Sequence, residues 1–268
     1  MSATSSEGGS DAPARRPARR QAEIAAYVVE HGTATAHELV EAFGVSLMTV
    51  HRDLDALERQ GVVRKYRGGV TAQPTSVFES NVAYRLNTAQ AQKQALARRA
   101  RDMVEPGMSV MLDDSTSALA VVRLLEGVAP LTVATNFLPA ISLLTAMPDV
   151  RLIVLGGIYS PTHDSFGGVP CAEAVEALQT DLLFCSVSAV SATHAYHQEQ
   201  EIVLVKRAML RAARTRVLMI DNAKLRRTAL HRLAPLTDFD LVLVDDQAPA
   251  DQVAALRDKG ARVEVVEV

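Results

Sequence analysis

Apolar residues near the N-terminus recur at helical spacing in three successive segments. The first segment is Gln21–His31, and Gly32 follows it where a helix should stop. Thr35 can cap a second helix, and after a Gly-containing turn Ser46 can cap a third helix over Leu47–Gln60. Two short helices joined by such a turn predict a helix-turn-helix.

The third helix has one apolar face and one polar face. At about 100° per residue, Val50, Leu54 and Leu57 share a narrow sector that we expect to face the core. A hydroxyl, an imidazole and a guanidinium near the start of the opposite face suit the major groove of DNA, so we expect base contacts in the first two turns. The residues on and beside this polar face are Met48, Thr49, His51, Arg52 and Arg59.

A short β-like stretch, Val62–Val70, follows the third helix and contains a pair of glycines. Its position favours a wing whose cations contact the DNA backbone, although a solvated hairpin would give the same pattern. Together with the helix cap and the polar face, the candidate DNA-contacting residues are Ser46, Met48, Thr49, His51, Arg52, Arg59, Arg64, Lys65 and Arg67.

The rest of the chain alternates β-branched runs with helical runs. Such alternation predicts a mainly parallel sheet with helices on both faces, and therefore an α/β fold beside the small N-terminal winged helix-turn-helix. Strands are expected at 109–112, 131–135, 150–155, 181–187, 216–220, 241–244 and 263–266. Helices are expected at 91–103, 117–125, 138–146, 172–178, 201–213 and 250–259.

Composition along the chain predicts the domain boundaries. Residues 1–14 are rich in Ser, Gly, Ala and Pro and are expected to form a disordered tail. Residues 73–90 show no consistent period and are expected to be a linker. The predicted DNA-binding domain is 15–72, and the predicted effector-sensing α/β domain is 91–268.

Charge and hydropathy narrow the class of protein. No apolar run is long enough to span a bilayer and the N-terminus is polar, so we expect a cytoplasmic protein with no membrane partner. The net charge of -3 means that any DNA contact must come from a local basic patch. One such cluster could reach phosphates or be simply solvated, and it consists of Arg15, Arg16, Arg19 and Arg20.

The two cysteines, Cys171 and Cys185, have neither the spacing nor the neighbouring ligands of a zinc site. We expect them to be buried, reduced thiols. The sequence therefore predicts no metal and no cofactor.

Several polar segments follow predicted strands. In open α/β sheets, ligands bind at the carboxyl ends of the strands. The segments in question are Asp113–Ser117, Thr135–Asn136, Gly156–Gly157 and Asp221–Lys224. Helix capping, a turn or a solvated lysine could equally explain each of them.

The segment Val45–Leu54, followed by Leu57, Gly61 and Arg67–Val70, resembles the signature of the DeoR family of transcription regulators. The resemblance extends over roughly residues 20–250. In the family two consecutive arginines usually precede the aspartate, whereas here the first is His51, which predicts a changed operator preference or pH-sensitive binding.

The later segments are similar to the DeoR sensor domain, whose fold is similar to ribose-phosphate isomerase and glucosamine-phosphate deaminase. The resemblance implies that a small phosphorylated, sugar-like effector binds there, with its phosphate on the D-x-S-T loop. It implies these effector-binding residues: Asp113, Ser115, Thr116, Ser117, Thr135, Asn136, Gly156, Gly157, Glu201, Lys206 and Lys224.

Two segments depart from the family pattern. Phe184–Val190 stands where the family has a glycine-rich turn, so we expect its side chains to narrow the pocket. His194 and His197 could contact the ligand, form a weak metal pair or lie in an exposed loop. We expect the loop, because a metal normally needs three or more placed ligands.

The predicted function is a transcription repressor of a carbohydrate or related catabolic operon, and not an enzyme. Its expected partners are double-stranded operator DNA and a phosphorylated metabolite that shifts the protein between DNA-competent and incompetent states. Palindromic operators imply a homodimer or a homotetramer. The alternatives are a sugar-phosphate isomerase or deaminase with an accessory winged helix, and a winged helix that binds protein instead of DNA.

Overall fold

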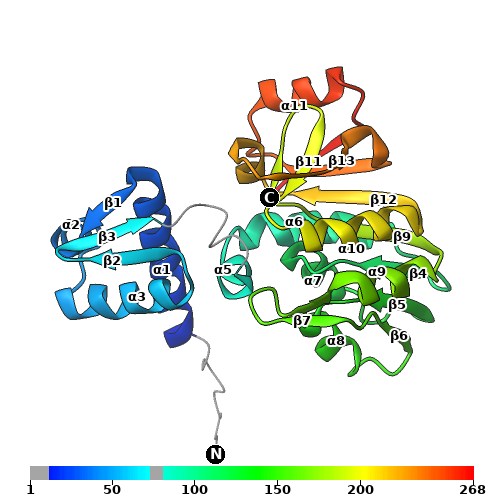
Figure 1. Cartoon of the computed structure of the whole chain (residues 1–268), viewed down its shortest axis with the longest axis horizontal. Helices are drawn as coiled ribbons and strands as arrows, with labels where there is room; N and C mark the ends of the chain where they lie inside the picture. Colours follow the sequence, from blue (N-terminus) through cyan, green and yellow to red (C-terminus); the bar gives the residue numbers. More distant parts are fainter. Residues whose placement is uncertain (1–11, 73–80) are drawn as a thin grey trace, which may run out of the picture. The chain divides into compact units, whose positions relative to one another are not determined.

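The structure is a computed structural model that describes residues 12–72 and 81–268 (Figure 1). The chain divides into two compact units, an N-terminal unit of residues 1–88 and a C-terminal unit of residues 89–268. The N-terminal unit contains α1 (Ala12–His31), β1 (Thr33–Thr35), α2 (Ala36–Phe43), α3 (Leu47–Arg59), β2 (Val63–Tyr66), β3 (Gly69–Ala72) and α5 (Val82–Asn87).

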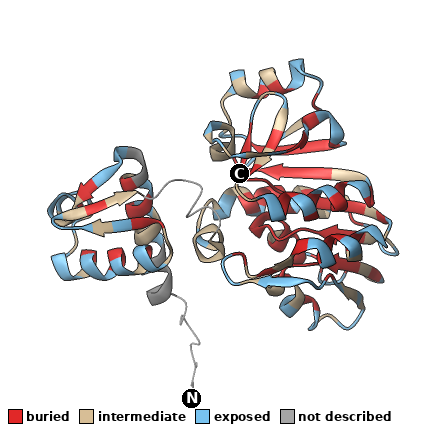
Figure 2. Cartoon of the chain, in the orientation of Figure 1, coloured by how far each residue is buried: buried red, intermediate tan, exposed pale blue. Residues whose placement is uncertain are grey.

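The N-terminal unit is a winged helix-turn-helix. Its three strands pair in the order β1-β3-β2, and the β2–β3 hairpin is the wing. The apolar stripe predicted for the third helix is confirmed, because Val50, Leu54 and Leu57 are buried against α1 and α2 (Figure 2). Thr35 caps α2 through a reciprocal bond with Glu38, as the capping-box spacing requires.

The structure differs from the sequence expectations at three places in this unit. Helix α1 begins at Ala12 instead of Gln21, so the last residues of the expected tail are helical, while residues 1–11 lie outside the described part of the chain. Hydrophobic periodicity detects only an apolar face, so it does not detect a helical extension whose sequence is rich in Ala and Arg. Residues 73–80 of the expected linker lie outside the described part of the chain, and residues 81–90 include α5 and the first residue of α6. Strand β1 was missed because three residues give too short a pattern.

The C-terminal unit is an α/β domain around a seven-stranded sheet, which confirms the predicted fold class. The sheet strands are β4 (Ser109–Leu112), β5 (Leu131–Thr135), β6 (Val150–Val154), β9 (Thr180–Cys185), β12 (Ala213–Ile220), β14 (Leu241–Asp245) and β15 (Val263–Val266). The helices are α6 (Gln90–Arg101), α7 (Thr116–Val122), α8 (Leu138–Leu144), α9 (Gly168–Glu176), α10 (Gln200–Arg211) and α11 (Ala250–Asp258), with 3-10 turns η1 (Asn222–Arg226) and η2 (Leu236–Asp238).

All seven strands are parallel, and both faces of the sheet are covered. Adjacent residues on a strand point to opposite faces, and Val110, Met111 and Leu112 on β4 are all buried (Figure 2). Met111 belongs to the core cluster that contains the inward residues of α9 and α10. Helices α6 and α7 pack against each other.

The strand order β15-β14-β12-β9-β4-β5-β6 places β4 beside both β5 and β9. The chain runs outward from β4 to β5 and β6, then returns to β9 and continues in the other direction. The boundary between β4 and β9 is therefore the topological switch point, where doubly wound folds open a crevice at the carboxyl ends of the strands.

Two small antiparallel sheets, which the sequence pattern did not predict, lie near the carboxyl ends of the parallel strands. One is β7 (Ile158–Ser160) paired with β8 (Ser165–Gly167). The other pairs β10 (Ala189–Val190), β11 (His194–His197) and β13 (His231–Pro235) in that order. The amide of Phe166 on β8 donates to the carbonyl of Asn136, which ties the first small sheet to the end of β5.

Candidate DNA interface and effector site

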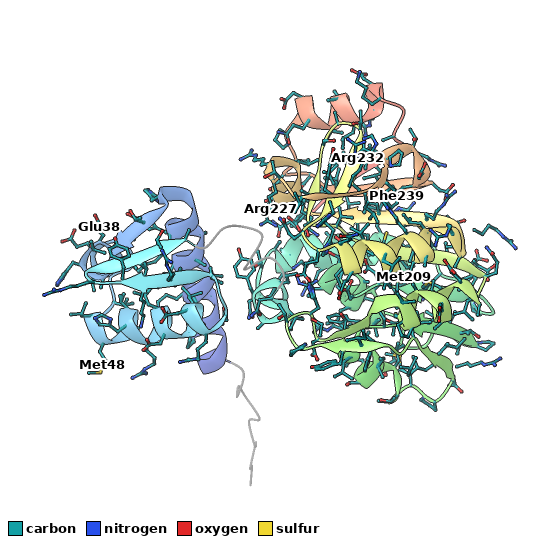
Figure 3. The ribbon with its side chains drawn as sticks, in the orientation of Figure 1. Glu38, Met48, Met209, Arg227, Arg232 and Phe239 are labelled. Atoms are coloured by element: carbon teal, nitrogen blue, oxygen red, sulfur yellow. The ribbon has the colours of Figure 1, made fainter. Side chains whose placement is uncertain are left out.

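The outer face of α3 is built by its N-terminal cap. Ser46 Oγ accepts a hydrogen bond from the Thr49 amide at 3.2 Å and lies 2.9 Å from Thr49 Oγ1. His51 and Arg52 are exposed, Thr49 is half-buried, and Met48 is 72% exposed and projects from α3 (Figure 3). The geometry leaves the first two turns of α3 accessible, as a reading helix needs.

A buried ion pair fixes α3 against α1. Asp53 is 1% exposed and accepts from Arg20 Nε at 2.6 Å, from Arg20 Nη2 at 3.3 Å and from Gln21 Nε2 at 3.0 Å. The hydrogen bond to Asp53 raises the pKa of Arg20. The Arg20 guanidinium is therefore used within the fold, and we expect it to contribute little to phosphate contact.

The wing presents its cations unequally. Arg64 and Arg67 are exposed, with Arg67 beside Gly68 at the hairpin turn. Lys65 instead pairs with Asp55, and its amide donates to Glu58 Oε1 at 3.0 Å. A Cβ at Gly69 would lie 2.6 Å from the carbonyl oxygen of Ala34, so only glycine lets the wing pack on β1. Of the α3 candidates, Arg59 is exposed in the last turn.

The effector candidates meet at the switch point between β4 and β9. Asp113, directly after β4, is 1% exposed and accepts from the amides of Ser115 at 3.0 Å and Ser186 at 2.8 Å. Asp113 also pairs with the ammonium of Lys206 from α10. The aspartate thus connects the ends of β4 and β9 with a buried cation from a covering helix.

Lys206 also lies 2.9 Å from Asp114 Oδ1, so one ammonium serves two adjacent carboxylates. Burial by itself would lower the pKa of Lys206, but the charges of Asp113 and Asp114 outweigh it and raise that pKa above its ordinary value. Lys206 is therefore charged at neutral pH, and the loop after β4 is held in place by a buried ion triad.

A histidine and a glutamate that the sequence did not single out complete this side of the site. His163, in the turn between β7 and β8, is 2% exposed, with Nε2 2.8 Å from Glu199 Oε1 and Nδ1 4.0 Å from Asp114 Oδ2. Ser165 donates to Asp114 Oδ2 at 3.3 Å. No spacing rule links these positions, because they meet only when β8 and the start of α10 fold beside β4.

Lys224 stands on the other side of the switch point. Its Nζ lies 2.5 Å from Ser186 Oγ and 3.7 Å from Asp221 Oδ2. Ser186 belongs to the segment after β9 in which we expected side chains to narrow the pocket, and it connects Lys224 to Asp113. Burial would raise the pKa of Asp221, but Lys224, Arg227 and Lys93 outweigh it and lower that pKa.

The hydroxyl and amide candidates are all buried near this edge. Ser115 Oγ accepts from the Ala118 amide and caps α7, and Thr135 Oγ1 accepts from the Phe137 amide at 3.2 Å. Asn136 Nδ2 donates to the Phe166 carbonyl at 2.7 Å. Two buried polar atoms, Asn136 Oδ1 and Ser117 Oγ, have no hydrogen-bond partner in the described structure, and Thr116 is 7% exposed beside Ser117.

Of the remaining candidates, Glu201 lies on the solvent-facing side of α10, and Gly156 and Gly157 follow β6. Glu201 is exposed on α10, because five residues of helix turn it away from the face that carries Lys206. Gly157 packs tightly, since a Cβ there would lie 2.4 Å from the Gly167 carbonyl oxygen and 2.9 Å from Cys171 Cβ. Gly156 is exposed, with open space where its Cβ would be.

The expectation of an exposed loop at His194 and His197 was wrong. His194 and His197 are the first and last residues of strand β11. His197 is 7% exposed, and its ring centroid lies 6.2 Å from that of His163. Within residues 12–72 and 81–268, no group of three or more His, Cys, Asp or Glu side chains could hold a metal ion.

The expectation of buried, reduced thiols is confirmed, because Cys171 and Cys185 are both free and buried. Burial, with the charge of Asp114, raises the pKa of Cys171 to about 11. Burial, with the charge of Asp113, also raises the pKa of Cys185. Neither thiol has the character of a reactive thiolate at neutral pH.

None of the helices in the described part of the chain combines the length and the apolar character needed to cross a bilayer.

Two features define the chain. One is a winged helix-turn-helix with an exposed helix face, and the other is an α/β domain with a polar cluster at its switch point. This combination defines a transcription regulator with a separate sensor domain.

Comparison with known families assigns both parts. The model of the DeoR-like helix-turn-helix domain matches residues 20–75, and the model of the DeoR C-terminal sensor domain matches residues 88–246. The chain belongs to the DeoR family, and it is a DNA-binding transcriptional regulator, as its sequence signature predicted.

Relatives match over nearly their whole length. The HTH-type transcriptional regulator YgbI of Escherichia coli K12 is 32% identical over 240 residues, covering 90% of this chain and 94% of the relative. The glycerol-3-phosphate regulon repressor of the same organism is 26% identical, covering 92% and 98%. The L-fucose operon activator of Haemophilus influenzae is 27% identical, covering 84% and 91%.

Among solved structures, ribose 5-phosphate isomerase A from Methanocaldococcus jannaschii is similar over 52% of this chain and 55% of its own. It is 16% identical, with a TM-score of 0.38.

Proposed function

We propose that this protein binds double-stranded operator DNA through α3 and the wing, and that a small phosphorylated metabolite bound at the β4–β9 switch point controls that binding. The observation that carries the DNA-binding part is the exposed face of α3 with Arg52 and His51. The buried Lys206 and the half-buried Lys224 at the sheet edge support the effector part. Regulation of this kind needs binding and no turnover, so we propose that the protein is not an enzyme.

The relatives suggest the kind of gene that is controlled. One is named a glycerol-3-phosphate regulon repressor and another an L-fucose operon activator. We propose that this chain is a repressor of a carbohydrate or related catabolic operon, acting in the cytoplasm without a cofactor. Paired reading helices on a palindromic operator would require a homodimer or a homotetramer.

Arg52→Ala is expected to weaken binding to the preferred operator by about 1–3 kcal/mol and to leave binding to random DNA nearly unchanged. The reason is that an exposed guanidinium in the second turn of α3 can form paired bonds with a guanine edge. Affinities would be measured by fluorescence anisotropy on an operator selected from a randomised library and on a scrambled duplex.

The wing supplies the control. Arg64→Ala is expected to weaken both duplexes alike and to reduce the salt dependence by about one ion, since it would lose one phosphate contact. Lys65→Ala should have a smaller effect, because Asp55 already pairs with Lys65. Equal losses on both duplexes for Arg52→Ala would refute its base-reading role.

Lys224→Ala and Thr116→Ala are expected to leave operator affinity unchanged and to remove the response to effector. Lys224 lies at the switch point on Ser186, and Thr116 is buried at the start of α7, far in sequence from the DNA-binding residues. The measurement is operator release by a sugar phosphate that raises the melting temperature of the unmodified protein. Unchanged release in both variants would place the effector site elsewhere.

A further inference from the structure

The large apolar side chains that are exposed in the described part of the N-terminal unit all lie in the two elements proposed to contact DNA. Leu47 and Met48, at the start of α3, are 39% and 72% exposed, and Tyr66, at the end of β2 in the wing, is 49% exposed. One exposed apolar side chain is ordinary on a protein surface. Three that are confined to these two elements indicate that apolar contact is part of the interface.

Met48 is the side chain that the cap of α3 leaves pointing outward. Its polar neighbours are engaged with each other, since Ser46 Oγ accepts from the Thr49 amide at 3.2 Å and lies 2.9 Å from Thr49 Oγ1. Thr49 is half-buried, whereas Met48 projects from α3 (Figure 3). The first turn of α3 therefore offers a partner a long, adaptable apolar side chain more readily than a hydroxyl.

Arg52 lies one turn further along the same face of α3. Residues four positions apart are neighbours on a helix surface, and both Met48 and Arg52 are exposed. One helical turn advances about 5.4 Å and one base-pair step about 3.4 Å. The two side chains would therefore reach base pairs that are one or two steps apart.

The chemistry of the methionine side chain selects the feature of a base pair that it can read. Methionine has no side-chain hydrogen-bond donor, and its thioether is only a weak acceptor. In the major groove the C5 methyl group of thymine is the apolar feature, whereas the other base edges present donors and acceptors that an apolar side chain would leave unpaired. Contact with Met48 would therefore favour thymine.

We propose that Met48 is a specificity-determining residue, which packs against the C5 methyl group of a thymine one or two base pairs from the guanine read by Arg52. The inference rests on the proposed function and specifies the operator sequence that the protein prefers. It separates the roles of two residues on one helix face, because Arg52 would supply hydrogen bonds to a base edge and Met48 would supply an apolar contact.

The test removes only the methyl group from the DNA. The full-length protein would select its operator from a randomised library, and we expect a thymine one or two base pairs from a guanine in each half-site. Replacing that thymine by uracil in one half-site keeps every hydrogen-bonding group of the base. Binding is expected to weaken about fourfold, the usual effect of losing one buried methyl group, as measured by fluorescence anisotropy. Uracil in place of a thymine outside the half-sites should leave the affinity unchanged.

A variant assigns the methyl contact to Met48. Met48→Gln keeps the length of the side chain at a position that is 72% exposed, so the fold should tolerate it. The ratio of the affinities for the thymine and uracil operators is expected to fall from about fourfold to less than about 1.5-fold, because the two changes remove the same contact. The matched control is Leu230→Gln, at an apolar side chain of the C-terminal unit that is 79% exposed, and it should keep the fourfold ratio.

The outcomes distinguish this inference from the function on which it rests. A fourfold ratio that persists in Met48→Gln, or equal affinities of the unmodified protein for the thymine and uracil operators, would overturn the role of Met48 and leave operator binding intact. If no operator sequence is selected at all, both the inference and the proposed DNA-binding function are overturned.

Discussion

Lys206→Met is expected to lower the free energy of unfolding of the C-terminal unit by about 3–5 kcal/mol, the usual result of removing one partner from a buried ion pair. The lysine side chain is 4% exposed, and the two carboxylates it serves are 0% and 3% exposed. Methionine fills much the same space, so the effect would come from two buried negative charges left without their cation and not from a cavity. Denaturant unfolding followed by circular dichroism measures the change, and hydrogen exchange at β4 and β9 assigns it to this unit.

The raised pKa of Lys206 determines how its contribution to stability changes with pH. Because the pKa of Lys206 is raised above its ordinary value of 10.5, its contribution is fully present below that value and is lost only as the pH rises through the higher folded pKa. The difference between Lys206→Met and the unmodified protein should therefore be constant over roughly pH 6 to 9.

Two further variants test the origin of this loss. Lys259→Met, at an exposed lysine after α11, should change stability by less than about 0.5 kcal/mol. Adding Asp114→Asn to Lys206→Met should recover part of the loss, since it removes one of the uncompensated charges. If Lys206→Met alone is as stable as the unmodified protein, the triad does not stabilise the fold.

Arg20→Met is expected to destabilise the N-terminal unit by about 2–3 kcal/mol. Among the described residues, the side-chain amide of Gln21, at 3.0 Å, would be the one side-chain partner left to the buried Asp53. We expect the lower part of the usual range because the Arg20 side chain is 24% exposed and that amide remains. Thermal unfolding followed by hydrogen exchange in α1 and α3 would measure the loss.

The neighbouring Arg19 supplies a matched control. Its side chain is 84% exposed and pairs with Glu23 one helical turn away, so Arg19→Met should change stability by less than about 0.5 kcal/mol. At a temperature where Arg20→Met is still folded, the salt dependence of its DNA binding should equal that of the unmodified protein. A smaller salt dependence would mean that Arg20 contacts phosphate after all.

The sequence predicted most of the elements because their patterns are local. The apolar stripe of α3 needs only helical geometry, and the buried parallel strands need only short β-branched runs between helices. Ser109–Leu112, Leu131–Thr135 and Val263–Val266 have the predicted bounds. The shortest strands, such as β8 and β10, were missed, because two or three residues show no period and their pairing partners lie far away in the sequence.

Some candidate effector residues could be selected from local motifs, and others are found only through contacts between distant segments. Asp113, Lys206 and Lys224 could be selected because each stands at a motif position near the end of a strand or on a helix. Glu201 was selected by the same motif, but it lies on the solvent-exposed face of α10. His163 and Glu199 belong to no motif. His163 contacts Asp114 from a hairpin, and Glu199 contacts His163 from the start of a helix that is distant in sequence.

By itself the sequence determined the class of fold, the exposed polar face of α3 and the family, because those depend on the order of residues over one or two turns or strands. Only the tertiary structure decided which charges are paired. Arg20 pairs with Asp53, Lys206 is buried between Asp113 and Asp114, and His163 lies beside Asp114. Electrostatic pairing and burial depend on distances between segments far apart in the chain, and folding alone sets those distances.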